Sequence, residues 1–244
     1  CITDELEKRG VDISFGTTLD SIDFSTDQNV QYTYKTDTGI HEGQSKWVID
    51  GSGFGGVLSH MLEIPTTIAK TDRIALFTKY DESGLSSEER STQITFDILE
   101  QDLWMWVIPF HNGETSIGFV GHEKYFEMPE GESDNVVEVL ERMITRSERF
   151  KERFSDTSKF SRKPTLITNY TRFSDVMYGE KFALTGNTME FLDPVFSSGV
   201  AFGTESSLTA AKLVARELKG EKVDWKTEYE DYLKRGVDVF RTYV

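Results

Sequence analysis

The sequence has few residues of the kinds that build metal sites, cross-links or membrane spans. Cys1 is the only cysteine among 244 residues, which excludes an internal disulfide framework and a cysteine-rich zinc site. The four histidines show no H-x-H or H-E-x-x-H spacing, so we expect no metal site at His41, His60, His111 or His122. No apolar run approaches the ~20 residues of a membrane span, and no signal peptide is visible.

Positive charge is also scarce, with 27 Lys and Arg against 42 Asp and Glu and a formal net charge of −15 at pH 7. Binding to nucleic acid or to an anionic membrane needs clustered positive charge, so neither partner is expected. The chain does contain 37% hydrophobic residues, with 17 Phe and 9 Tyr, which is too many for a disordered acidic tail. These values predict an acidic, globular, cytoplasmic protein.

The first residue is unusual, because the chain starts at Cys1 without a methionine and directly within a helix-like segment. This start predicts a piece of a longer protein. A motif that is missing from the sequence would then lie upstream of Cys1.

Hydrophobic spacing predicts the order of the main elements. Residues 2–9 have the spacing of a helix that Gly10 ends, and alternation over 11–15 predicts a strand. Four β-rich runs between polar turns predict an antiparallel sheet, at 74–80, 92–99, 103–110 and 115–120. Three later segments have helical spacing, at 136–144, 206–218 and 225–240.

A glycine-rich segment, Gly51-Ser52-Gly53-Phe54-Gly55-Gly56, follows the short apolar strand 47–49 and fits G-x-G-x-x-G. A dinucleotide fingerprint also needs a long helix, a second strand and an acidic residue ~20 positions further on. Only residues 57–62 are available before Pro65, after which the chain becomes β-rich. The favoured interpretation is that these glycines let the backbone pass close to a ligand or a neighbouring strand.

A second segment of interest runs from a predicted strand end at Gly186, through Asp193-Pro194, to a helix start at Ser197-Ser198-Gly199. Free backbone N–H groups at a helix start, aided by the helix dipole, can bind an anion or a polarised carbonyl oxygen. The alternative is an ordinary serine N-cap with no ligand.

Four segments resemble motifs of flavin-dependent halogenases and their FAD-dependent oxidoreductase relatives. They occur along this chain in the same order as in that family. The segment 192–200, Leu-Asp-Pro-Val-Phe-Ser-Ser-Gly-Val, resembles the flavin-contact segment of that family. Residues 104–109, Trp-Met-Trp-Val-Ile-Pro, match its W-x-W-x-I-P motif, and the run 115–120 follows as the family's next strand does. Residues 50–53, Asp-Gly-Ser-Gly, resemble its internal Asp-Ala-Ser-Gly segment. Together these motifs cover about residues 1–220.

The resemblance implies a PHBH-like fold of the α+β or α/β class, in which a FAD-binding domain carries an inserted antiparallel sheet that holds the substrate. On this basis residues 1–64 are part of the FAD-binding domain, and 65–165 form the sheet domain with its helices. Residues 166–222 return to the FAD-binding domain, and 223–244 form a C-terminal helix. The nucleotide-binding G-x-G-x-x-G and the halogenase lysine would both lie upstream of Cys1.

The family's functional residues can be assigned only at matching positions. The resemblance implies cofactor contacts from Asp50, Gly51, Gly186, Asn187, Asp193, Pro194, Gly199 and Val200. Of these, Pro194, Gly199 and Val200 would approach the isoalloxazine ring, and the N–H groups of Ser198 and Gly199 match the family's halide site. The family's Gly-Asp, whose carboxylate holds the FAD ribityl chain, is Gly186-Asn187 here, and an amide can still donate and accept hydrogen bonds.

Trp104 and Trp106 alternate along a predicted strand and therefore share one face. The resemblance places both beside a tunnel between flavin and substrate, along which hypohalous acid would pass. The alternative is a pair of core tryptophans in an aromatic-rich sheet.

The resemblance implies halogenation of an electron-rich aromatic substrate, either free or tethered to a carrier protein. The reaction would use chloride or bromide, oxygen, and reduced FAD supplied by a flavin reductase. One alternative is a related FAD-dependent dehydrogenase, reductase or monooxygenase that uses no halide. The other is a non-catalytic ligand-binding or scaffold domain, which the absent nucleotide fingerprint favours.

Overall fold

The computed structural model describes residues 2–26, 28–69, 72–86, 88–89, 91–127, 135–192, 194 and 197–242. The chain divides into two compact units, a first unit of residues 1–68 and 171–244 and a second unit of residues 69–170. The sequence places these boundaries at 64/65 and 165/166. The positions differ because β5 (Thr66–Ile68) pairs within the first unit, whereas β10 (Thr165–Thr168) pairs within the second.

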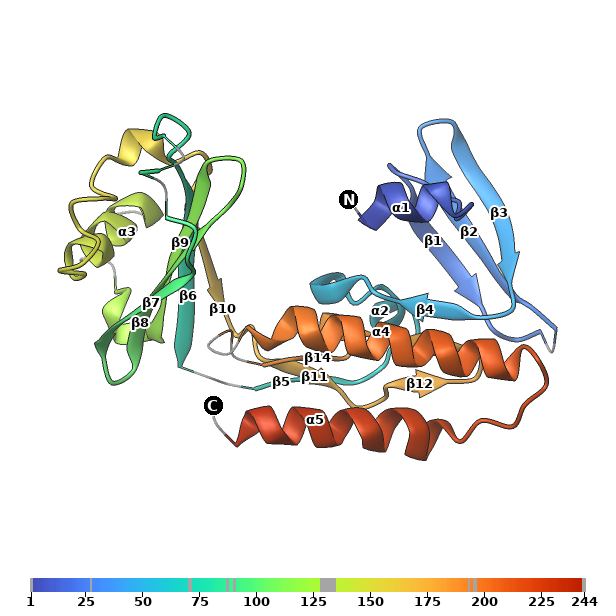
Figure 1. Cartoon of the computed structure of the whole chain (residues 1–244). Helices are drawn as coiled ribbons and strands as arrows, with labels where there is room; N and C mark the ends of the chain where they lie inside the picture. The colour runs from blue at the N-terminus through green and yellow to red at the C-terminus, as the bar shows by residue number, and fades with distance from the viewer. Residues whose placement is uncertain are drawn as a thin grey trace. The chain divides into compact units, whose positions relative to one another are not determined.

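The described residues of the first unit form three small sheets (Figure 1). The antiparallel sheet β1-β2-β3 contains Thr18–Asp23, Val30–Thr36 and Gly39–Ser45. The sheet β12-β13-β4 contains Tyr178–Gly179, Phe182–Leu184 and Val48–Asp50, and its β13–β4 pair is parallel. The antiparallel sheet β14-β11-β5 contains Glu190–Phe191, Arg172–Ser174 and β5.

Helices and short helical turns complete the first unit, and its buried core includes Leu58, Leu184, Leu213 and Tyr229. The long helices are α4 (Ser198–Glu217) and α5 (Asp231–Arg241), the second of which follows the π-helix η6 (Lys226–Glu230). The shorter elements are α1 (Ile2–Lys8), α2 (Val57–Met61), and the 3-10 turns η1 (Gly53–Gly55) and η4 (Gly186–Thr188).

Within the described residues of the second unit, an antiparallel sheet has the strand order β10-β6-β9-β8-β7. The strands are β6 (Arg73–Asp81), β7 (Thr95–Glu100), β8 (Leu103–Pro109), β9 (Glu114–His122) and β10. Alternate residues of β8 and β9, at 103, 105 and 107 and at 117 and 119, belong to one buried core, as side chains on one face of a sheet do. The predicted antiparallel sheet is therefore confirmed, as is a mixed α/β fold.

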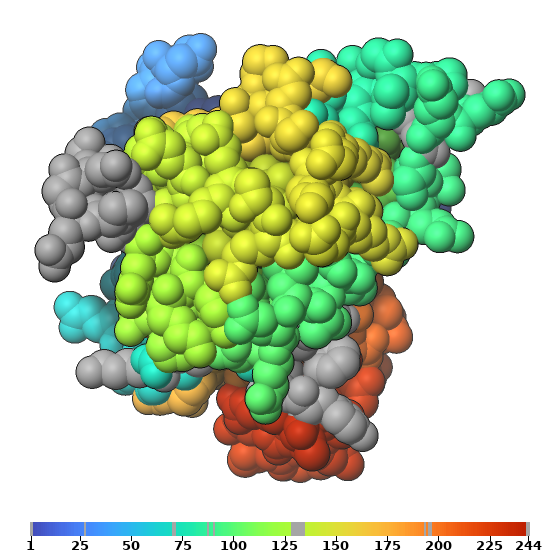
Figure 2. Space-filling view, turned by 90° about the vertical axis from the view of Figure 1, so that its left-hand side faces the viewer, coloured from blue at the N-terminus to red at the C-terminus, as the bar shows by residue number. Residues whose placement is uncertain are grey.

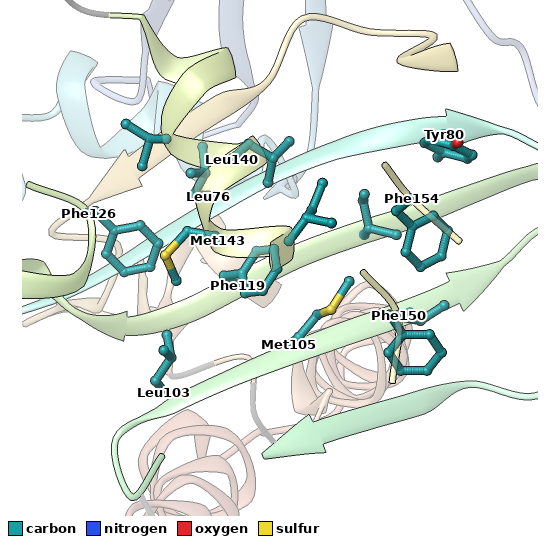
Figure 3. Packing of buried hydrophobic residues seen from close by; sticks show 14 residues of the cluster. Leu76, Tyr80, Leu103, Met105, Phe119, Phe126, Leu140, Met143, Phe150 and Phe154 are labelled. Atoms are coloured by element: carbon teal, nitrogen blue, oxygen red, sulfur yellow. The ribbon is translucent and has the colours of Figure 1, made fainter. Parts of the chain in front are cut away.

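One face of this sheet packs against α3 (Val136–Thr145) and the segment that follows it, which includes η3 (Thr157–Lys159). Figure 2 shows α3 and this segment, in yellow-green and yellow, as a continuous surface. A further turn, η2 (Glu123–Tyr125), follows β9. The core between sheet and helix includes Met105, Phe119, Leu140 and Phe154, each fully buried (Figure 3).

Three sequence-based boundaries are wrong or shifted. Residues 11–15 form no strand; Phe15 is 76% exposed, because no neighbouring strand pairs with this alternating segment. Helix α4 begins at Ser198, where the sequence predicts a helix start at 197–199, and the predicted helix 206–218 is only its C-terminal part, since residues 198–205 have little apolar periodicity. The expected helix 225–240 is a π-helix followed by α5.

Among the described residues, no helix has the length and apolar character needed to cross a membrane. The same residues contain no group of three or more His, Cys, Asp or Glu that could hold a metal ion.

The carboxylate of Glu114 is expected to make the second unit sensitive to acid. Its Oε2 accepts hydrogen bonds from Lys79 Nζ (2.9 Å) and Asn112 Nδ2 (3.0 Å), and its Oε1 accepts one from Ser161 Oγ (2.7 Å). These bonds, that from Lys79 above all, lower the pKa of Glu114 from 4.5 to about 2. Because the pKa is lower in the folded chain, this stabilisation is complete above pH 4.5 and is lost as the pH falls toward 2.

Denaturant unfolding of the wild type and Glu114→Gln, from neutral to acid pH, measures this contribution. We expect the free energy of unfolding of Glu114→Gln to be lower at neutral pH and to depend less on acid. The exposed Glu152→Gln in the same unit is the matched control and should keep the wild-type pH slope. Equal pH slopes for Glu114→Gln and the wild type would contradict this account.

Candidate functional site

The candidate site lies where the parallel strands β4 and β13 end. Asp50, the last residue of β4, pairs with Leu184, the last residue of β13. The loops that leave the two strands therefore start side by side, one with the glycine-rich segment 51–56 and the other with η4. In open α/β sheets, ligands bind beyond such carboxyl ends of parallel strands.

Asp50 holds the glycine-rich loop in place through hydrogen bonds to its backbone. Its side chain is buried, with Oδ1 accepting a hydrogen bond from the N–H of Ser52 (2.7 Å) and Oδ2 one from the N–H of Leu58 (2.8 Å). Its carbonyl oxygen accepts bonds from the N–H (2.9 Å) and hydroxyl (3.0 Å) of Thr185. Each carboxylate oxygen thus bonds to the backbone, and Asp50 fixes the loop and the start of α2.

Gly186 brings the second loop into close contact with α4. Its φ is +56°, and a Cβ at this position would lie 3.3 Å from the Cα of Gly203. Its N–H donates to Ser206 Oγ (2.9 Å), and that hydroxyl donates to the carbonyl of Phe202 (2.8 Å). A side chain at 186 would therefore strain the backbone and separate the loop from the helix.

Tyr229 supports the same strand end from η6. Its hydroxyl donates to the carbonyl of Leu184 at 2.5 Å, and the residue is fully buried. Burial raises the pKa of Tyr229, so the phenol stays protonated and remains a donor at physiological pH.

Asn187 lies between the two loops and the start of α4. Its Cβ is 3.9 Å from a Cβ position on Gly53, and its Oδ1 is 3.8 Å from a Cβ position on Gly199. The side chain is half-buried, and among the described residues its amide has no hydrogen-bond partner. A half-buried, unpartnered amide beside glycine backbone can bind a polyhydroxyl ligand, because it can donate and accept hydrogen bonds.

The middle of the glycine-rich loop is held from two sides. The N–H of Gly53 donates to Thr188 Oγ1 (2.8 Å), and its carbonyl accepts from Arg172 Nη2 (2.8 Å). The Arg172 guanidinium also lies 5.1 Å from the ring centroid of Phe54, which packs against Phe191 at 4.9 Å. These contacts fix the backbone of the glycine-rich loop, and they place Phe54 of the loop against Phe191 of β14.

The start of α4 is not capped in the ordinary way. Ser197, the N-cap residue, has φ 51° and ψ 31°, and its side chain makes no capping hydrogen bond. The serine N-cap alternative is therefore wrong for this residue. Since the first N–H groups of an α-helix have no acceptor within the helix, those of Ser198, Gly199 and Val200 are suited to bind an anion or a carbonyl oxygen.

The other predicted residues of this segment have different exposures. Ser198 is buried, whereas Val200 is 83% exposed, and Pro194 is half-buried. The carbonyl of Pro194 accepts a hydrogen bond from the N–H of Ser197 (2.9 Å). Asp193, which the sequence assigns to cofactor binding, lies outside the described residues. Gly51 lies in the loop, and a Cβ there would be 3.5 Å from Thr185 Oγ1.

Trp104 and Trp106 belong to the second unit, on the sheet face opposite α3. Their ring centroids are 5.9 Å apart, so the prediction that they share a face is confirmed. Phe77 extends the row at 5.8 Å from Trp106, and Phe96 at 5.6 Å from Trp104. Trp106 donates to Ser116 Oγ (3.1 Å), while the buried Trp104 Nε1 has no partner among the described residues. Neither residue belongs to the core under α3.

Several residues that hold the site were not predicted from the sequence. Thr188, Arg172 and Tyr229 each bond to a residue far away in the chain, and no local pattern marks them. Ser206 is different, because Gly199, Gly203 and Ser206 are spaced along one face of α4. Small residues at that spacing indicate a close approach of backbone to the helix.

The described residues combine a parallel strand pair that ends in a glycine-rich loop with an antiparallel sheet domain, a mixed α/β fold. No family model matches the chain. The chain is a distant homologue, across most of its length, of flavin-dependent halogenases and flavoproteins. Its fold matches solved structures of both kinds.

Two curated relatives illustrate the sequence similarity. The flavin-dependent halogenase armH3 of Armillaria mellea is 26% identical over 229 residues, which cover 86% of this chain and 45% of that protein. The 1H-pyrrole-2-carbonyl-[peptidyl-carrier protein] brominase of Pseudoalteromonas luteoviolacea is 26% identical over 205 residues, covering 82% and 48%. The chain thus spans about half the length of these relatives.

Two solved structures illustrate the similarity of fold. A flavoprotein/dehydrogenase from Cytophaga hutchinsonii is 34% identical, with a TM-score of 0.88 over 99% of this chain and 58% of that one. The flavin-dependent brominase Bmp2 is 23% identical, with a TM-score of 0.80 over 98% and 59%.

Replacement of Gly186 by alanine is expected to destabilise the first unit by about 1–3 kcal/mol, because alanine at φ +56° is strained and meets the Cα of Gly203. The control is Gly236→Ala within α5, where no atom lies within 4 Å of a new Cβ. That change should stabilise the protein by up to about 1 kcal/mol. Denaturant unfolding measures both, and equal effects of the two changes would contradict the proposed close approach.

Proposed function

We propose that the protein containing these residues is an FAD-dependent oxidoreductase of the flavin-dependent halogenase type. Its substrate would be an electron-rich aromatic ring, either free or tethered to a carrier protein. Chloride or bromide and oxygen would be co-substrates, and a flavin reductase would supply reduced FAD. The proposal is supported by the homology of the chain and above all by the unpartnered amide of Asn187.

The residues of the first unit fit the cofactor. The Asn187 amide would hydrogen-bond the ribityl hydroxyls, while the glycine-rich loop admits a ligand next to its backbone. The N–H groups of Gly199 and Val200 would face the N1/O2 edge of the isoalloxazine ring, with Pro194 beside it. When bound, the flavin supplies the redox chemistry with oxygen.

This chain's own contribution would be to bind, orient and exclude water. The N–H groups of Ser198 and Gly199 would hold the halide, which the positive end of the α4 dipole favours. Trp104 and Trp106 would line the path to the substrate. Their row of rings offers stacking partners to a planar aromatic substrate.

A second candidate is a related FAD-dependent dehydrogenase, reductase or monooxygenase that uses no halide. One observation favours it: the Cytophaga hutchinsonii flavoprotein/dehydrogenase is 34% identical, whereas armH3 is 26% identical. The second candidate is also favoured by Asn187, which stands where halogenases have an aspartate.

Replacement of Asn187 by alanine is expected to weaken FAD binding about fivefold to tenfold, the effect of losing one hydrogen bond. The measurement is a titration of the complete apo gene product with FAD, followed by flavin fluorescence. Asn187→Asp should bind at least as well as wild type, because it restores a strong acceptor. Asn29→Ala, which removes a half-buried amide bonded to Gln44 in the same unit, is the control and should leave the affinity unchanged.

If the wild-type protein bound no FAD, the cofactor proposal would be wrong, and a non-catalytic domain would be favoured. If Asn187→Ala instead bound FAD as tightly as wild type, the assignment of this amide would be wrong.

The presence or absence of halogen in the product separates the two enzyme candidates. We expect turnover with a flavin reductase, oxygen and chloride or bromide to add one halogen to a phenol, indole or pyrrole substrate. Mass spectrometry detects the halogen by its isotope pattern. Oxidised product without halogen at saturating halide would overturn the halogenase and support the second candidate.

A further inference from the structure

The paired strands β11 and β14 present different side chains on the two faces of their sheet. Arg172 pairs with Phe191, and Phe173 pairs with Glu190. Because side chains alternate along a strand, Arg172 and Phe191 share one face and Phe173 and Glu190 share the other. The first face contacts Phe54 of the glycine-rich loop, and the second contacts α5.

The contact with α5 is an ion pair between Glu190 and Arg241. Arg241 Nη2 lies 2.6 Å from Glu190 Oε1, and its guanidinium lies 5.4 Å from the ring centroid of Phe173. The Glu190 side chain is only 4% exposed, whereas that of Arg241 is 45% exposed. Arg241, the last residue of α5, thus pairs with a buried carboxylate on the short strand β14.

Strand β14 contacts the start of α4 through Phe191. Phe191 follows Glu190, and its ring lies 3.7 Å from a Cβ position on Gly199. The same ring packs on Phe54. A displacement of β14 would therefore reach both the glycine-rich loop and the first turn of α4.

We propose that Arg241 is a positioning residue, whose ion pair with Glu190 fixes β14 and thereby the first turn of α4 beside Asn187. The role of that turn in binding flavin and halide rests on the proposed function. The fixing of the turn by α5 does not, because it follows from contacts within the first unit.

The charge of Glu190 makes the fixing of the first turn of α4 dependent on pH. Burial raises the pKa of Glu190 above its usual value of 4.5, although Arg241 opposes the shift. Of the other charged groups on α5, Asp238 raises this pKa and Lys234 lowers it. Arg172, on β11, lies on the opposite face of this sheet. Glu190 therefore takes up a proton at a higher pH than an exposed glutamate does, and because its pKa is higher in the folded chain, protonation favours the buried position of this carboxyl.

Hydrogen exchange of the apo protein tests the device without any cofactor. In Arg241→Met, backbone amides of residues 197–202 should exchange about tenfold faster than in wild type. Arg241→Lys should restore much of the protection. Arg235→Met, the same change elsewhere on α5, and the amides of β6 and β9 in the second unit are the controls and should be unchanged. Unchanged exchange at 197–202 in Arg241→Met would overturn the proposal.

The pH profile separates a charge effect from a loss of packing. Corrected for intrinsic exchange rates, the protection of residues 197–202 in wild type should rise as the pH is lowered through the raised pKa of Glu190, because protonation removes the cost of burying its charge. The profile of Glu190→Gln should be flat. Parallel profiles for the two proteins would overturn the role of this ion pair.

A titration with FAD completes the experiment. Arg241→Met should raise the Kd for FAD about tenfold and alter the visible spectrum of the bound flavin, with Arg241→Lys intermediate. Faster exchange with unchanged affinity and spectrum would overturn the positioning role. If wild type bound no FAD, the proposed function would fail, and the exchange data alone would decide whether α5 fixes the turn.

Discussion

The parallel pairing of β4 with β13 is the constraint on which the candidate site depends. Only this register places the ends of both strands together, with Asp50 opposite Leu184. The pairing alone is short, so side chains reinforce it: Asp50 receives hydrogen bonds from Ser52, Leu58 and Thr185, and Tyr229 donates to the carbonyl of Leu184. Buried, fully bonded polar groups of this kind specify one arrangement, since any other would leave them unpaired.

Glycine and small residues then allow backbones to approach each other around Asn187. Gly186 lies against Gly203, and Gly53 is bonded on one side to Thr188 and on the other to Arg172. The Asn187 amide remains unpartnered among the described residues, although its neighbours are consistently bonded. Real proteins depart from local consistency mainly at functional sites, and this amide is such a departure.

Short-range sequence patterns predict much of the fold but less of the candidate site. β-rich runs between polar turns predicted the sheet of the second unit, and period-two alternation predicted the shared face of Trp104 and Trp106, because each strand there has a paired neighbour. The same pattern failed at 11–15, where the segment has no partner. Asp50 stays a predicted cofactor contact, and its carboxylate bonds to the N–H groups of Ser52 and Leu58, a local side-chain-to-backbone arrangement common for Asp. Contacts such as Gly53–Thr188 and Glu190–Arg241 join distant residues, so no local pattern encodes them.

The central claim is that the flavin binds where the Asn187 amide and the first turn of α4 meet. Nuclear magnetic resonance of ¹⁵N-labelled protein, with and without FAD, tests it most directly. The account predicts large shifts of the Asn187 side-chain amide and of the backbone amides of Ser198–Val200, with no shift of the Asn112 side chain in the second unit. FAD binding that leaves the Asn187 and α4 signals unmoved would contradict it.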